Sequence, residues 1–182
     1  MSCRLLLVRH GETVDNVNRI MQGQTQGRLT LNGIEQAREL GRQLRGEHID
    51  VFLSSDLARA VGTLRIIVEE RNLPQQTLQT HPPAPPCRGV GLLLRERDWG
   101  SFTGRYIPDL KDEVWPDDIE TLEQMKARAR RFLDYVREHY QGKTVLAVGH
   151  GIINKAIQSV YTGKPMNEIQ KMANCEVRVL EL

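Results

Sequence analysis

Long apolar runs are scarce in this sequence. The first, from Leu5 to Val8, has four residues, and no later one exceeds the stretch around residues 89–94. Both are far too short for the core of a signal peptide or for a membrane-spanning helix. We therefore expect a cytoplasmic protein with no membrane partner.

The sequence also lacks a large excess of charge of either sign, and it lacks closely spaced pairs of cysteines. The 25 basic and 23 acidic residues are well mixed and leave a net charge of +2, so neither a nucleic-acid partner nor a polybasic membrane anchor is indicated. Cys3, Cys87 and Cys175 are odd in number and far apart, unlike the close pairs of zinc sites. Reduced thiols are the expectation in a cytoplasmic protein.

The elements expected from apolar spacing alternate between strands and helices. A chain of 182 residues, 40% hydrophobic, fits a single domain over residues 1–182. The order β-α-β-α followed by β-α-β-α-β predicts a three-layer α/β/α sandwich with a mostly parallel central sheet. The expected strands include 5–8, 51–53, 145–148 and an edge strand at 176–182, and the expected helices are 30–44, 57–68, 121–140 and 151–161.

Several residues mark where these helices begin and end. Thr30 is a candidate cap for the first helix, and residues 54–56 offer capping side chains for the second. Thr121 and Gln124 fit a capping box, and Gly163 is placed to end the helix before it. Four arginines of helix 121–140 are expected on a solvated face: Arg128, Arg130, Arg131 and Arg137.

Three segments lack a regular pattern. Residues 13–27 are polar and predict a long loop of the kind that carries function. The proline-rich segment 81–91 excludes helix and central strand. Residues at about 98–118 combine charge, aromatic rings and glycines, and predict a small lid-like insertion over the sheet edge.

Two apolar runs end in the same kind of turn. Run 5–8 leads into Arg9-His10-Gly11, and run 145–148 leads into Gly149-His150-Gly151. Ligands of open α/β sheets gather beyond the carboxyl ends of the strands, so the two imidazoles are expected to meet there. Arg59 lies in the first turn of helix 57–68, close to the carboxyl end of strand 51–53. Its side chain is expected to point away from the apolar stripe of that helix.

These side chains suit the binding and transfer of a phosphoryl group. Arg9, Arg59, one charged histidine and the free amides after Gly151 form a receptor for a phosphate dianion, because guanidinium forks match phosphate oxygens. The other histidine, when neutral, can accept the phosphoryl group. Glu96, beside aromatic groups, is the candidate proton donor and later base. A divalent metal site at His10 and His150 is the alternative, but the spacing typical of metal ligands does not accompany them.

The residues around these turns resemble a known signature. The segment Leu7-Val8-Arg9-His10-Gly11-Glu12-Thr13 is similar to that of the histidine phosphatase superfamily, or phosphoglycerate mutase-like family. Further matches follow in the family's order: Asn16, Gln22-Gly23, Leu29-Thr30, Gly33, Gln36-Ala37, Ser54 to Ala60, Thr63, Leu94-x-Glu96, Gly100, Gly104 and Val148 to Gly151. The resemblance covers about residues 4–160 and implies the phosphoglycerate mutase-like fold.

The resemblance also implies roles for individual residues. His10 would be the phosphorylated nucleophile, Glu96 the proton donor and acceptor, and Arg9, Arg59 and His150 the phosphate pocket. Further substrate contacts would come from Asn16, Gln22, Gly23 and the amide of Gly151. The family uses no metal or other cofactor. Arg28 stands where many relatives carry a proline.

The function implied is that of a hydrolase acting on a small-molecule phosphate monoester. The excursion from Glu96 to Thr121 spans about 25 residues, shorter than a phosphoglycerate mutase normally inserts there. A mutase needs a more complete lid to protect its phosphohistidine from water. We therefore expect a phosphatase of the broad-specificity, α-ribazole phosphatase or fructose-bisphosphatase-like branch, with mutase activity and non-catalytic binding of a phosphorylated ligand as alternatives.

Overall fold

The computed structural model describes residues 2–71 and 89–182. Its sheet has the strand order β2-β3-β1-β4. The strands are β1 (Arg4–Arg9), β2 (Val51–Ser54), β3 (Thr144–Gly149) and β4 (Val177–Glu181). β3 runs parallel to both β1 and β2, and only β4 is antiparallel, at the edge beside β1. The mostly parallel sheet and its edge strand confirm the expectation.

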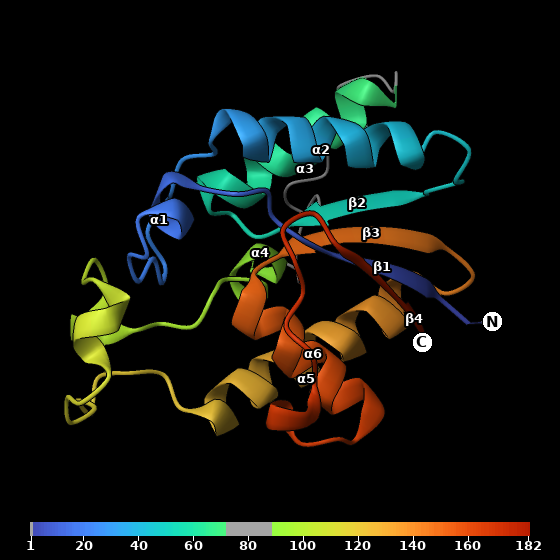
Figure 1. The fold of residues 1–182 in the computed structure, drawn as a ribbon. Coiled ribbons are helices and arrows are strands. Elements are labelled where there is room, and N and C mark those ends of the chain that lie inside the picture. Colours follow the sequence, from blue (N-terminus) through green and yellow to red (C-terminus); the bar gives the residue numbers. More distant parts are fainter. Residues whose placement is uncertain (1, 72–88) are drawn as a thin grey trace.

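Helices cover both faces of this sheet, as Figure 1 shows. On one face lie α2 (Leu31–Gln43) and α3 (Ala58–Glu70), and on the other lie α5 (Leu122–His139) and α6 (Gly151–Thr162). The shorter elements are α1 (Val14–Val17), α4 (Val90–Leu93) and the 3-10 helices Gly100–Phe102, Ile107–Leu110 and Met166–Glu168. The three-layer α/β/α architecture is therefore confirmed. No helix within 2–71 or 89–182 is long and apolar enough to cross a membrane.

Alternation along β1 divides the core into two parts. Leu5 and Leu7 pack with the side chains of α5 and α6, whereas Leu6 and Val8 pack with those of α2 and α3. All four are at most 2% exposed. A strand that is buried on both faces reads as a continuous apolar run, which explains why this strand was recognisable from sequence.

The expected helix ends are largely correct. The Thr30 hydroxyl accepts a hydrogen bond from the amide of Gly33, and Thr121 and Gln124 form the complete capping box. Gly163 ends α6 in the left-handed conformation. The prediction for α3 was wrong in one detail: the helix follows Leu57, without a side-chain cap from residues 54–56.

Three other local predictions also need correction. The polar segment 13–27 contains one helical turn, α1, which Thr13 and Asn16 cap reciprocally. The predicted order contained a fifth strand, and the apolar residues left for it, 92–94, lie in and directly after α4. Within the proline-rich segment 81–91, residues 81–88 lie outside the described residues, and Val90 and Gly91 belong to α4.

The segment 98–118 packs on the loop that follows β1. Its Phe102 and Leu110 form a small apolar cluster with Ile119, against which Met21 packs. Backbone hydrogen bonds of 2.8 to 2.9 Å join residues 19–21 to residues 104–107. Segments far apart in sequence thus form one unit at the carboxyl end of the sheet, on the left in Figure 1.

Candidate active site

The two His-Gly turns meet at neighbouring strand ends. β1 and β3 pair in parallel with Arg9 opposite Gly149, so His10 and His150 leave the sheet side by side. Their ring centroids are 5.1 Å apart, and the side chains are 2% and 0% exposed respectively. The structure therefore brings the two imidazoles together, as the strand pattern predicted.

The hydrogen bonds of these histidines assign opposite tautomers. Nδ1 of His10 lies 2.7 Å from the carbonyl oxygen of Gly11, which can only accept, so Nδ1 carries the proton and Nε2 keeps its lone pair. Nδ1 of His150 accepts a 3.1 Å hydrogen bond from Nε of Arg59, so its proton is on Nε2. One ring therefore offers a nucleophilic nitrogen and the other a hydrogen-bond donor.

Burial keeps both rings neutral. Desolvation and the nearby Arg59 and Arg9 lower the pKa of His10 to about 3, against a smaller opposing effect of its hydrogen bond to Gly11. The same kinds of cause, burial first and then Arg59 and His10, hold the pKa of His150 well below its ordinary value. A neutral His10 at physiological pH is the form that can attack phosphorus.

Arg59 comes from the first turn of α3 and is 1% exposed. Besides His150, its guanidinium bonds to backbone carbonyl oxygens of residues 23–26, with 2.8 Å to Gly23 and a contact to Thr25. Burial lowers its pKa to about 10, with Glu96 acting in the opposite direction, so it remains charged at neutral pH. Arg59 thus positions both His150 and the loop after α1.

Two buried donors in the site are unsatisfied. NH1 of Arg9 donates to the carbonyl of Met172 at 2.7 Å, but Nε of Arg9 has no hydrogen-bond partner among the described residues. Nε2 of His150 has none there either. Buried polar groups are normally hydrogen-bonded, so a pair of unsatisfied donors indicates a place for an acceptor. With charged Arg9 and Arg59, that acceptor is best an anion.

The carboxylate of Glu96 lies on the N-terminus of α6. Its oxygens accept hydrogen bonds of 3.1 to 3.2 Å from the amides of Ile152 and Ile153 and one of 2.9 Å from the amide of Arg97. The amides expected to be free for phosphate are therefore largely bound to Glu96. A Cβ on Gly151 would lie 3.6 Å from both Nε of Arg9 and Oε2 of Glu96, so the carboxylate and the Arg9 guanidinium both lie near this glycine.

The other expected substrate contacts hold the loop together. Asn16 Oδ1 accepts from the Thr13 amide at 3.1 Å, and Gln22 Oε1 accepts from the Thr13 hydroxyl at 2.9 Å. Gly23 has φ +52° and its carbonyl bonds to Arg59. The geometry links Gln22 and Gly23 to the site through Thr13 and Arg59, and their direct contact with substrate stays a prediction.

Comparisons with known proteins show the family of this chain. The family model of the histidine phosphatase superfamily, branch 1, matches residues 5–182. The chain belongs to the histidine phosphatase superfamily. Its predicted phosphoglycerate mutase-like fold and its assignment to the phosphatases are thereby supported.

Individual superfamily members carry different names. An uncharacterized phosphatase, PhoE, of Bacillus subtilis (strain 168) is 32% identical over 92% of this chain and 82% of its own. A probable phosphoglycerate mutase, GpmB, of Yersinia pestis (strain Pestoides F) is 30% identical over 96% of this chain and 82% of its own. The crystal structure of the α-ribazole phosphatase from Shigella flexneri has a TM-score of 0.75 at 26% identity, covering 94% and 86% of the two chains.

Three residues to which the sequence assigned no role, Thr63, Met172 and Asn174, also hold the turn after β1. Thr63 Oγ1 accepts from the Gly11 amide at 3.0 Å, and Asn174 Nδ2 donates to the His10 carbonyl at 2.9 Å. The carbonyl of Met172 binds Arg9. Thr63 belongs to a matched motif, so that signal was available, whereas Met172 and Asn174 lie in an irregular segment before β4 without any pattern.

The described residues hold no group of three or more His, Cys, Asp or Glu side chains that could bind a metal ion. A cleft of about 650 Å³ lies beside residues 95–98, but none of Arg9, His10, Arg59 and His150 lines it. The cleft and the group formed by these four side chains are therefore separate features of the structure.

Proposed function

We propose that this protein is a metal-independent phosphomonoesterase that hydrolyses a small phosphorylated metabolite through a phosphohistidine on His10. The observation that carries the proposal is the pair of opposite tautomers. Nε2 of His10 is unprotonated and nucleophilic, while Nε2 of neighbouring His150 is a buried donor without a described partner. Arg9 adds a second such donor and a positive charge.

The first step transfers the phosphoryl group to nitrogen. Arg9, Arg59 and the Nε2–H of His150 bind and neutralise the phosphate oxygens. The lone pair of His10 forms the N–P bond as the ester P–O bond breaks, and the leaving oxygen takes a proton from Glu96. His10 needs no prior deprotonation, because burial already keeps it neutral.

The second step releases phosphate to water. Glu96, now a carboxylate, accepts a proton from the attacking water as the new P–O bond forms and the N–P bond breaks. Inorganic phosphate leaves, and protonated Glu96 and neutral His10 are restored. The Oε2 atom of Glu96 and the Nε atom of Arg9 each lie 3.6 Å from the Cβ position of Gly151, the residue after His150, which supports this role for Glu96.

The chain acts as one domain, and substrate choice lies in residues 13–28 and 98–118. These segments pack on one another next to the phosphate receptor, so the lid-like insertion and the loop jointly face whatever the phosphate is attached to. The superfamily members named above make α-ribazole phosphate and 3-phosphoglycerate the first metabolites to compare with simple aryl and sugar phosphates.

The test is phosphate release from such a panel in excess EDTA. We expect EDTA-resistant release by the wild type and by a His48→Ala control, whose side chain is 85% exposed. His10→Ala should abolish release, and Glu96→Gln should reduce it sharply. Activity lost to EDTA would refute the metal-free mechanism. A folded wild type that releases no phosphate but interconverts phosphoglycerates would establish a mutase instead, and one that only binds phosphate esters would establish a binding protein.

A further inference from the structure

Arg128 of α5 is not a solvated residue. Its Nε and NH2 donate to the two carboxylate oxygens of Glu120 at 2.6 and 2.8 Å, and the side chains are only 17% and 12% exposed. A two-point pair of this kind fixes both side chains in orientation as well as in distance. The expectation that Arg128 belongs to a solvated face was therefore wrong.

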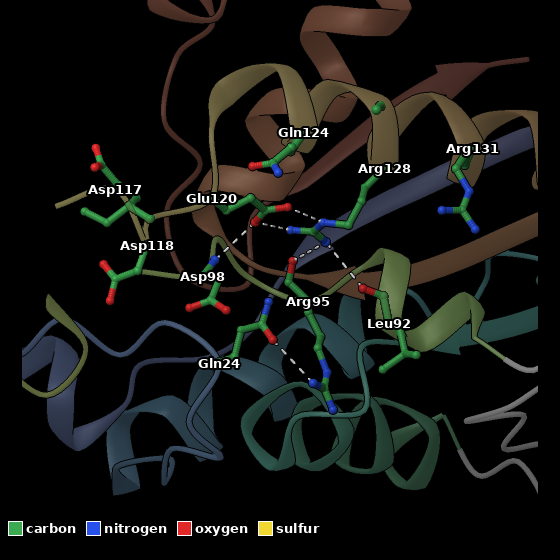
Figure 2. A pocket seen from close by; sticks show the side chains of 12 residues that line it. Gln24, Leu92, Arg95, Asp98, Asp117, Asp118, Glu120, Gln124, Arg128 and Arg131 are labelled. Carbon is green, nitrogen blue, oxygen red and sulfur yellow. Dashed lines mark hydrogen bonds and ion pairs between the residues drawn. The ribbon is translucent and has the colours of Figure 1, made fainter. Parts of the chain in front are cut away.

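The remaining donors of Arg128 reach the chain that leads to Glu96. NH1 lies 2.9 Å from the carbonyl oxygen of Arg95 and 3.0 Å from that of Leu93, with a weaker contact to Leu92 at 3.3 Å. NH2 lies 3.4 Å from the carbonyl oxygen of Glu96 itself. Figure 2 shows the guanidinium between Glu120 on one side and the backbone of residues 92–95 on the other. The carbonyls of Leu93 and Arg95, at the end of α4 and just after it, are thus both bound by one side chain.

Glu120 holds the chain on the other side of Glu96. Its carboxylate accepts from the amide of Asp98 at 3.1 Å, and its carbonyl oxygen accepts from Nε of Arg97 at 2.7 Å. The segment 92–98 is therefore attached to the Arg128–Glu120 pair both before and after Glu96. The Glu96 side chain, in turn, lies on the amides of Ile152 and Ile153.

From these contacts we infer that Arg128 and Glu120 act as a positioning pair for Glu96. They set where its carboxyl group stands relative to the phosphoryl group on His10, without touching substrate. Because Glu120 lies two residues after segment 98–118, the pair links that segment to the proton donor. The inference rests on the proposed function, in which Glu96 protonates the leaving oxygen.

The consequence concerns only reactions that need this proton. An alkyl phosphate must have its leaving oxygen protonated as the P–O bond breaks, whereas p-nitrophenolate leaves without help. Misplacing a reacting group by about 1 Å can cost about 100-fold in rate. A displaced Glu96 should therefore slow transfer from an alkyl ester far more than transfer from p-nitrophenyl phosphate.

The experiment compares kcat/KM for β-glycerophosphate and p-nitrophenyl phosphate, because kcat/KM reports the steps through transfer to His10. For Arg128→Gln we expect a loss of about 10- to 100-fold on the alkyl ester and at most about threefold on the aryl ester. Glu120→Gln, a milder change in the same pair, should show the same selectivity. Arg131→Gln is the control. Arg131 is exposed on the same helix, and it lines the cleft of about 650 Å³ that Arg128 also lines. Equal losses on both esters would overturn the inference.

A second readout is independent of turnover. Amide hydrogen exchange of residues 92–98 should be at least about tenfold faster in Arg128→Gln than in the wild type, while exchange in α2 stays unchanged. Unchanged exchange in 92–98 would overturn the positioning role even if the protein is a phosphatase. Conversely, if the wild type lacked phosphatase activity but Arg128→Gln still exchanged faster than the wild type over residues 92–98, the pair would be retained as a clamp on this segment and only the proposed function would be refuted.

Discussion

Nε of Arg59 lies 3.1 Å from Nδ1 of His150, and this one hydrogen bond decides which nitrogen of His150 carries the proton. The neighbouring ring of His10 has the opposite arrangement because its Nδ1 donates to the carbonyl of Gly11. The ring centroids of these two neutral histidines are 5.1 Å apart, and the hydrogen bond at each Nδ1 atom gives the two rings different chemistry at Nε2.

Arg59→Lys tests this relationship. A lysine retains the charge but cannot donate to His150 and to the 23–26 carbonyls from one planar fork. We expect the ring nitrogens of His150 to show a mixture of tautomers by nitrogen-15 NMR and kcat to fall about 100-fold. Arg65→Lys, at an exposed site on the same helix, should change neither. A single Nε2–H tautomer in Arg59→Lys would refute the assignment.

The buried imidazoles also predict how stability depends on pH. His10 titrates at about 3 when folded and near 6.5 when unfolded, so below pH 6.5 the unfolded chain binds a proton that the folded protein does not. The stability that neutral, buried His10 contributes to the free energy of unfolding is therefore fully present above pH 6.5. It is lost as the pH falls from 6.5 toward 3. The slope is at most about 1.4 kcal/mol per pH unit for each such histidine.

Urea denaturation at several pH values measures this slope. The wild type should lose stability between pH 6.5 and 4, and His10→Gln should lose less because one of the two buried histidines is gone. His48→Gln, which changes an exposed histidine, should keep the wild-type slope. If His10→Gln and the wild type had the same slope, the low pKa of His10 would be wrong.

The turn after β1 approaches α2 closely. A Cβ on Gly33 would lie 2.0 Å from the carbonyl oxygen of Glu12. Because this is a backbone atom, relieving the clash would require a shift of the main chain. Gly33→Ala should lower the free energy of unfolding by about 1–3 kcal/mol or more. At Gly46 a Cβ would meet nothing within 4 Å, so Gly46→Ala should be neutral or slightly stabilising. Equal stability of the two variants in urea would contradict this account of the packing.

Gly151 offers a change that separates activity from stability. Its substitution by alanine would place Cβ 3.6 Å from both Arg9 Nε and Glu96 Oε2, at ordinary contact distances and without backbone strain. We expect unchanged thermal stability, but a loss of about 10- to 200-fold in kcat/KM as the methyl group occupies space in the site. The inhibition constant of inorganic phosphate should rise in parallel, and an unaltered constant would place the phosphate elsewhere.

The parts of this molecule that were predictable are those with a local cause. Buried strands show as apolar runs, Thr121 and Gln124 cap their own helix, and parallel pairing alone brings His10 beside His150. The expected order contained a fifth strand where residues 92–94 lie in and directly after α4, because a short apolar run suits a strand or a buried helical turn equally well.

Tertiary partners were beyond such reasoning. Arg128 looks solvated on its own helix, but its side chain is only 17% exposed because the carbonyls of Leu93 and Arg95 arrive from another segment. Glu96 was predicted as a proton donor, but its place on the amides of α6 depends on two segments separated by more than 50 residues. Local patterns identify reactive side chains, and long-range contacts orient them.

The most direct test of the account is the identity of the covalent intermediate. The wild type is mixed with p-nitrophenyl phosphate, quenched in alkali within milliseconds, digested, and its peptides are sequenced by mass spectrometry under conditions that preserve phosphohistidine. We predict an acid-labile phosphoryl group on His10, formed as fast as p-nitrophenol is released and absent from His10→Ala. Turnover without any phosphorylated peptide, or with the phosphoryl group on another residue, would contradict the central claim.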